Sequence, residues 1–217
     1  MSLFETRKKN NDKSSKKNIL FIIVITIICL IIQGVIIFFI PYLSYTTAKV
    51  EVNNDISKYN DYIGPVAKKE YKNKWDMDES IFPTKITNNM NVIDYKMVYY
   101  NPWDAQYLSY LVIEYNKEDY QEEVKRLSEY KSTNYLGYYN VTGFTKYNLL
   151  AMYADSYNGF VYAITNNDNQ IIYVELIFCN YFYDLDYKQY INNDYLPDNF
   201  DATIDNSYGK RELSKKN

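Results

Sequence analysis

Residues 19–40 form an uninterrupted apolar segment, and this segment constrains the fold of the chain more than any other feature. Eighteen of its 22 residues are Ile, Leu, Val or Phe, none is charged, and Pro41 follows directly. A helix of this length reaches about 33 Å, which is enough to cross a hydrocarbon core of about 30 Å. We therefore predict a transmembrane helix over residues 19–40, with the lipid bilayer as the first partner of the protein.

The charges on either side of this segment predict its orientation. Six lysine and arginine residues precede it between Arg7 and Lys17, whereas the first charge after it is Lys49. Because basic flanks stay on the cytoplasmic side, we expect residues 1–18 to be a disordered, basic cytoplasmic tail and the C-terminal part to lie outside. A cleaved secretory signal is the alternative, but its apolar core is normally about 7–15 residues long. We expect an uncleaved, single-pass anchor.

Composition excludes several classes of function. The first 18 residues hold six basic and two acidic residues, which leaves 18 basic against 25 acidic residues and a net charge of −7 for the rest. This acidic surplus argues against a nucleic-acid partner. The chain has no histidine, which removes histidine-based catalysis and the commonest zinc ligand, and we predict no cofactor and no metal site.

Tyrosine is unusually abundant, with 27 residues between Tyr42 and Tyr208. The accompanying excess of Asn, Lys and Ile is typical of an AT-rich, bacterial genome, so the tyrosines by themselves say little about function. The two cysteines cannot form a disulfide within one chain, because Cys29 lies in the apolar segment and Cys179 in a strand-like segment far outside it. We expect Cys179 to be a small buried hydrophobic residue.

Beyond the apolar segment we divide the chain into a membrane-proximal stalk, a single α+β domain and a solvated tail, over residues 41–65, 66–206 and 207–217. In the stalk, Val52, Ile56, Tyr59 and Ile63 recur at spacings of four, three and four. This spacing predicts one face of a helix, which Gly64-Pro65 ends. The outer part, about 176 residues, is large enough for one domain with its own core.

Segments rich in β-branched and aromatic residues alternate with turn residues and predict five strands, over residues 91–100, 106–115, 147–154, 160–165 and 170–178. Neighbouring strands are joined by short turns, which favours an antiparallel sheet of about five strands. In the last strand Ile172, Val174 and Leu176 alternate with Tyr173 and Glu175. We expect the aliphatic set to face the helices and Tyr173 and Glu175 to lie on the other face.

The clearest soluble helix begins after Asn116, a residue type that caps helices, and carries acidic residues in its first turn. Its apolar residues Tyr120, Val124 and Leu127 share one face. A second helix over residues 184–193 is expected to close the domain. The fold class is therefore α+β, with one transmembrane helix and then a sheet that has helices packed on one face.

Trp103 is the main candidate for a ligand- or partner-binding residue, together with Tyr99 and Tyr107 on either side of the same turn. Loops carry binding residues more often than the elements they connect, and an exposed indole can stack on a sugar ring or anchor a partner protein. The competing interpretation is that Trp103 folds back onto the edge of the sheet and is purely structural.

Two weaker patterns leave alternatives open. Glu114 and Glu175 lie on strands amid apolar neighbours, where a glycoside hydrolase could carry its carboxylate pair, but we favour glutamates of a solvated face without a catalytic role. In the apolar segment, Thr26, Cys29 and Gln33 share one helix face, through which a homo-oligomer could form, but we favour a solitary anchor.

Together these features predict a membrane-anchored extracytoplasmic binding or interaction module with an accessory, sensing or immunity-type role, and they favour a protein that is not an enzyme. A protein or a cell-wall polysaccharide is the expected partner. The alternative function is a carbohydrate-active enzyme or a cell-wall-binding protein that uses carboxylates and aromatic residues.

Overall fold

The computed structural model describes residues 3–215, and the side chains from residue 18 onward. The chain forms two compact units, Met1–Thr47 and Ala48–Asn217, which we describe separately. The second unit is called the domain below.

The described residues of the first unit, from Leu3 to Thr47, are helical throughout. It consists of α1 (Leu3–Gly34), one π-helical turn (Val35–Phe39) and α2 (Ile40–Thr47). Within the described residues, one helix, Asn18–Thr47, is long and apolar enough to cross a membrane. The π-helical turn has a local cause: Pro41 has no N–H to donate and its ring would clash with the preceding turn, and the Ile40 N–H instead bonds to the Val35 carbonyl. The prediction of disorder before residue 18 is wrong, because α1 begins at Leu3.

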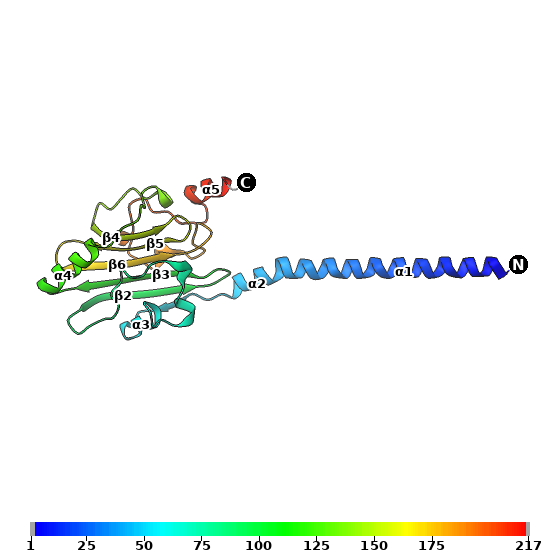
Figure 1. Ribbon diagram of the computed structural model, residues 1–217, viewed down its shortest axis with the longest axis horizontal. Helices are drawn as coiled ribbons and strands as arrows, with labels where there is room; N and C mark the ends of the chain where they lie inside the picture. The colour runs from blue at the N-terminus through cyan, green and yellow to red at the C-terminus, as the bar shows by residue number, and fades with distance from the viewer. Residues whose placement is uncertain (1–2, 216–217) are drawn as a thin grey trace. The chain divides into compact units, whose positions relative to one another are not determined.

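The domain is built on one antiparallel sheet of six strands, in the spatial order β1-β2-β3-β6-β5-β4 (Figure 1). The strands are β1 (Glu51–Asn53), β2 (Asn91–Tyr100), β3 (Gln106–Glu114), β4 (Asn148–Asp155), β5 (Gly159–Thr165) and β6 (Gln170–Ile177). The α+β class is confirmed, and all five predicted strands are present within one residue of their expected ends. The sixth strand, β1, pairs with β2 through only three residues, too few to leave a sequence pattern.

Both faces of the sheet are covered, so the central strands are buried on both sides. One face, which we call the C-terminal face, packs against residues 135–147 and 178–208 and includes Leu108, Tyr162 and Leu176. The other, the α4 face, packs against residues 56–90 and α4 (Lys117–Ser128) and includes Leu111 and Tyr173. Every residue of β5 is consequently buried.

Helix α4 begins as predicted and packs on the face opposite to the one predicted. The Asn116 side chain accepts a hydrogen bond from the Asp119 N–H, and Leu127 is fully buried. However, the Tyr173 hydroxyl donates to Glu123 Oε1 of α4 at 2.6 Å, so Tyr173 faces this helix and Ile172 does not. Alternation along a strand separates the two faces but does not say which covering segment lies on each.

The predicted stalk helix is also absent. Val52 lies in β1, and only two short helical segments follow, a 3-10 turn over Ile56–Lys58 and α3 over Tyr59–Tyr62. Tyr59 and Ile63 are 1% exposed because they belong to the core under the α4 face. Their helical spacing therefore reflects burial in this core and does not indicate a continuous helix.

Two differences concern the C-terminal part. Residues 184–193 form a 3-10 turn (Tyr187–Gln189) where we predicted a helix, whereas the predicted solvated tail contains α5 (Ser207–Ser214). Asn206 caps α5 through the Gly209 N–H and also donates to the Tyr181 carbonyl, and Tyr208 is buried in the core of the C-terminal face. Helices therefore lie on both faces of the sheet.

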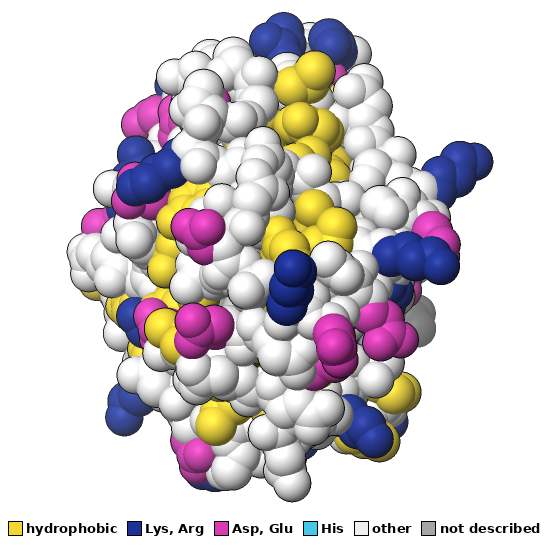
Figure 2. All heavy atoms as spheres, turned by 90° about the vertical axis from the view of Figure 1, so that its left-hand side faces the viewer, with side chains coloured by type: hydrophobic (Ala, Val, Ile, Leu, Met, Phe, Trp, Pro, Cys, Tyr) yellow, Lys and Arg dark blue, Asp and Glu magenta, His cyan; other side chains and the backbone are white. Residues whose placement is uncertain are grey.

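Tyrosine replaces aliphatic residues through much of both cores. Buried rings pack edge to face, for example Tyr139 against Phe178 with centroids 5.0 Å apart. Their hydroxyls find backbone acceptors, as Tyr162 does at the Tyr195 carbonyl and Tyr183 at the Tyr107 carbonyl, both at 2.7 Å. Each such tyrosine fills volume and also links the sheet to a covering segment by donating to a backbone carbonyl. The space-filling view in Figure 2 shows acidic and basic side chains interspersed on the surface, with hydrophobic side chains visible between them.

Candidate functional site

The α4 face of the sheet contains a buried lysine held between two carboxylates. Lys74 is 3% exposed, and its Nζ lies 2.8 Å from Oε2 and 2.9 Å from Oε1 of Glu175, which is fully buried on β6. The same Nζ contacts Glu79, and the Ser109 hydroxyl donates to Glu175 Oε1 at 2.6 Å. Lys74 also lies over the Tyr107 ring, 5.6 Å from its centroid. We call Lys74, Glu79, Glu175 and Ser109 the lysine cluster.

Sheet register and a strained loop bring these residues together. Ser109 and Glu175 are direct partners across β3 and β6, so both side chains point to the α4 face. Lys74 reaches them from a loop in which three consecutive residues, Lys74, Trp75 and Asp76, have φ values of 28°, 59° and 60°. A left-handed conformation costs each non-glycine residue about 1–3 kcal/mol, so the buried contacts of Lys74 must offset that cost.

The charges of the lysine cluster do not balance when both carboxylates are ionised, because one ammonium then faces two negative groups. Burial raises the pKa of Glu79 to about 7; the adjacent Lys74 lowers this pKa and Glu175 raises it further. Although Glu79 contacts the Lys74 ammonium, we assign it the extra proton below pH 7, because burial disfavours its charged form more than the contact with Lys74 favours it. The protonated cluster is then neutral.

This proton predicts a pH-dependent stability. Between the ordinary glutamate pKa of 4.5 and about 7, the unfolded chain has lost the Glu79 proton and the folded chain retains it. The free energy of unfolding should therefore fall as the pH rises through this window, by at most about 1.4 kcal/mol per pH unit from this group. Thermal unfolding at several pH values would measure this slope.

Glu79→Gln supplies the control, because it keeps the size of the side chain and removes the titration. The variant should show a flatter dependence between pH 4.5 and 7. If the free energy of unfolding varied with pH equally in the two proteins, a group other than Glu79 would hold the proton.

A pocket of about 430 Å³ opens beside the lysine cluster at one end of the sheet. Its lining combines aromatic rings, amides and charged groups: Asn73, Lys74, Trp75, Asp76, Ala105, Tyr107, Tyr157 and Asn158. The Trp75 indole N–H donates to the Ala105 carbonyl at 2.7 Å, yet the residue remains 38% exposed. We call this the tryptophan pocket.

The structure brings part of the predicted binding site to this pocket. Tyr107 lines it, and Tyr99 packs against Tyr107 with ring centroids 5.3 Å apart. Trp103 lies in the β2–β3 turn, two residues from Ala105 of the pocket wall, and is 61% exposed. More than half of the Trp103 side chain is therefore open to solvent.

The sequence patterns predicted no role for Lys74, Glu79 or Trp75, although they drew attention to Glu175. These three residues lie in a mixed, charged stretch without helical or strand periodicity, so neither burial nor partners could be read from it. The one available signal was Glu175 itself, a carboxylate inside a strongly apolar strand, because a buried carboxylate needs a nearby cation or hydrogen-bond donors.

Glu114 and Glu175, whose pairing in a catalytic site the sequence did not favour, lie apart in the structure. Glu114 is opposite Gln170, five residues along β6 from Glu175, which separates the two positions by about 16 Å along the strand. The odd spacing also puts them on opposite faces of the sheet. Glu114 is exposed and accepts a hydrogen bond from Asn91 at 2.8 Å.

Cys179 is confirmed as a buried residue, at 5% exposed, and burial raises the pKa of its thiol to about 12. A thiol with such a pKa is not a nucleophile at neutral pH. Among the described residues, no group of three or more Cys, Asp and Glu side chains is arranged to hold a metal ion.

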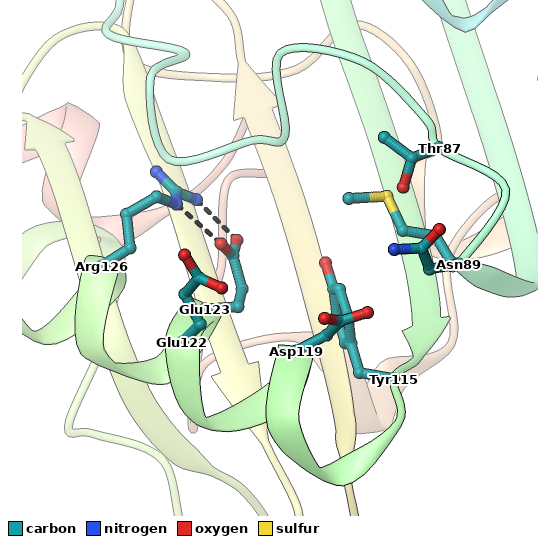
Figure 3. A pocket seen from close by; sticks show the side chains of 8 residues that line it. Thr87, Asn89, Tyr115, Asp119, Glu122, Glu123 and Arg126 are labelled. Atoms are coloured by element: carbon teal, nitrogen blue, oxygen red, sulfur yellow. Dashed lines mark hydrogen bonds and ion pairs between the residues drawn. The ribbon is translucent and has the colours of Figure 1, made fainter.

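A second hollow, of about 330 Å³, lies between α4 and the loop before β2 (Figure 3). Asp119, Glu122, Glu123 and Arg126 contribute to it from α4. The Arg126 guanidinium pairs with Glu123 and also donates to the carbonyls of Ser80 and Ile81 at 2.9 and 2.7 Å. These bonds fasten the loop to α4, which gives the arginine a structural role.

Comparison of the chain with protein-family models, with curated proteins and with solved structures finds no match.

Proposed function

We propose that this protein is a membrane-anchored extracytoplasmic binding module, whose helix Asn18–Thr47 crosses the membrane and whose domain engages a ligand or partner through one end of its sheet. The observation that carries the proposal is that both tryptophans of the chain lie at this end of the sheet. Trp103 is 61% and Trp75 38% exposed, and each is on or beside the wall of the tryptophan pocket. Tryptophan is enriched among the residues that dominate binding energy.

The chemistry of the lysine cluster supports binding over catalysis. A lysine acts as a nucleophile or base when its pKa is depressed and its lone pair is available. The Lys74 Nζ instead contacts two carboxylates and a tyrosine ring and is almost wholly buried, so it is not free to attack a bound molecule. The cluster therefore serves to hold the strained loop, and with it Trp75, in place.

The location is tested with two matched cysteine variants and a membrane-impermeant maleimide on intact cells. Ser214→Cys, at the exposed end of α5, should be labelled, whereas Ser14→Cys should react only after permeabilisation. Cys179 is buried and Cys29 lies within the apolar helix, so both should contribute little background. The reverse labelling pattern would contradict the proposed orientation, and recovery of a shortened protein in the medium would indicate a cleaved signal.

The binding surface is tested by replacing Trp103 with a photo-crosslinking amino acid in intact cells. We expect crosslinked products from position 103 and none from Ile93, which is 52% exposed at the opposite end of β2 and is therefore a matched control. Equal crosslinking from both positions would mean that the tryptophan end is not the binding surface. The substitutions should barely affect folding, because both side chains are largely exposed.

A further inference from the structure

The tryptophan pocket offers little to an anionic ligand. Its one lysine, Lys74, is already neutralised by Glu175 and Glu79, so an anion would find no available positive charge among the lining residues. Asp76 is exposed on the pocket wall and adds a negative charge. An anionic ligand is therefore disfavoured, and the remaining lining groups are uncharged rings and amides.

Those uncharged groups suit a molecule with one apolar face and a polar rim. The Trp75 indole is held by its bond to the Ala105 carbonyl, so its ring is a fixed platform that loses little entropy when a ligand stacks on it. Asn73, Asn158 and Asp76 place amide and carboxylate groups around the same pocket. A sugar ring matches this arrangement, because its C–H face packs on an aromatic ring while its hydroxyls both donate and accept hydrogen bonds.

The backbone supplies a third observation. The three consecutive residues with positive φ, Lys74, Trp75 and Asp76, all line the pocket. Strain of this kind is found at ligand sites, where the surrounding contacts fix a conformation that the chain alone would not adopt. The volume of about 430 Å³ also lies within the usual range of small-molecule pockets, about 300–1,000 Å³.

We propose that the tryptophan pocket binds an uncharged sugar unit of an extracellular glycan, stacked on Trp75 and hydrogen-bonded to Asp76 and the neighbouring amides. This inference rests on the proposed function and names the ligand class of that site.

The test follows the tryptophan emission of the full chain in detergent micelles, and Trp75→Phe, which leaves Trp103 as the only tryptophan, shows how much of any change comes from the pocket. The uncharged probes are maltotetraose, cellotetraose, mannotetraose and chitotetraose, each titrated to about 10 mM to detect a Kd near 1 mM. Tetragalacturonate and choline serve as the anionic and cationic probes. We expect a saturable change in emission with at least one uncharged probe and none with either charged probe.

A second pair of variants places the response in the pocket. Asp76→Asn should weaken binding by about tenfold, the effect of losing a strong hydrogen bond to a charged group. Asp168→Asn removes an exposed carboxylate from the β5–β6 turn, outside the pocket lining, and should leave the Kd unchanged. Both aspartates are exposed, so both variants should retain the melting temperature of the parent protein.

The inference is overturned if no uncharged probe changes the emission, if a charged probe binds more tightly, or if Asp76→Asn binds as well as the parent. Any of these results alongside external labelling of Ser214→Cys and crosslinking at position 103 would leave the proposed function standing with another ligand class. Protection of Ser214→Cys in intact cells would instead reject the proposed function, whatever the probes show.

Discussion

Lys74→Met is expected to lower the free energy of unfolding by about 3–5 kcal/mol, the cost of leaving a buried charge without its partner. Lys74 is 3% exposed and bonds Glu175, which is completely buried, so removal of the ammonium leaves a buried carboxylate that keeps the Ser109 hydrogen bond but has lost its cation. The strained loop at residues 74–76 also loses the contact that holds it. Thermal or denaturant unfolding of the full chain in detergent, followed by near-ultraviolet circular dichroism, would measure the loss.

Two comparisons separate this effect from a general sensitivity of the loop. The triple variant Lys74→Met, Glu175→Leu, Glu79→Gln removes all the charges of the cluster and should recover much of the lost stability, because a buried ion pair can often be replaced by apolar residues without loss. Lys68→Met, in the same segment, breaks an exposed ion pair with Asp61 and should change stability little. A large loss from Lys68→Met, or none from Lys74→Met, would show that the lysine cluster is not what stabilises the loop.

Gly159→Ala is expected to be similarly damaging, with a loss of about 3–5 kcal/mol from overpacking and backbone strain combined. A Cβ atom at Gly159 would lie 2.1 Å from the Leu176 carbonyl oxygen and 2.9 Å from a ring carbon of Phe178. The residue also has a φ of +104°, which L-residues rarely adopt. Since β5 and β6 are both buried on two faces, neither strand can move aside at low cost.

Gly137→Ala is the matched control for the clash. Gly137 has a φ of +83°, but a Cβ atom there would meet nothing within 4 Å. Only the strain remains, so we expect a loss of about 1 kcal/mol. The difference between the two losses in the free energy of unfolding, measured by the same transition, gives the cost of the steric clash between residue 159 and β6. If the two glycines proved equally sensitive, strain alone would account for both.

The helices and strands that were predicted correctly are specified by residues close to one another in the sequence. β5 and β6 consist of β-branched and aromatic residues bounded by turn residues, and α4 follows a capping asparagine, so short stretches of sequence specify them. α5 was missed because its amphipathic face spans only eight residues at the end of a charged segment. The helix predicted over residues 52–63 failed because burial in the core produced a helical spacing by chance.

The candidate site could be predicted only in part. Trp103 and Tyr107 belong to a recognisable turn and strand, and Tyr107 does line the tryptophan pocket. The lysine cluster could not be foreseen, because Lys74 and Glu175 are 101 residues apart and meet only after the loop has folded over the sheet. Nothing in the local sequence distinguishes Lys74 from the solvated lysines around it.

The sequence by itself determined that this protein has an apolar helix long enough to cross a membrane and an antiparallel sheet, because hydrophobic length and alternation are properties of neighbouring residues. The tertiary structure alone decided which face of the sheet α4 covers, which lysine is buried, and that a strained loop holds Trp75 at the edge of a pocket. Those features depend on contacts between distant residues, whose energies are set by burial, and burial exists only once the chain is folded.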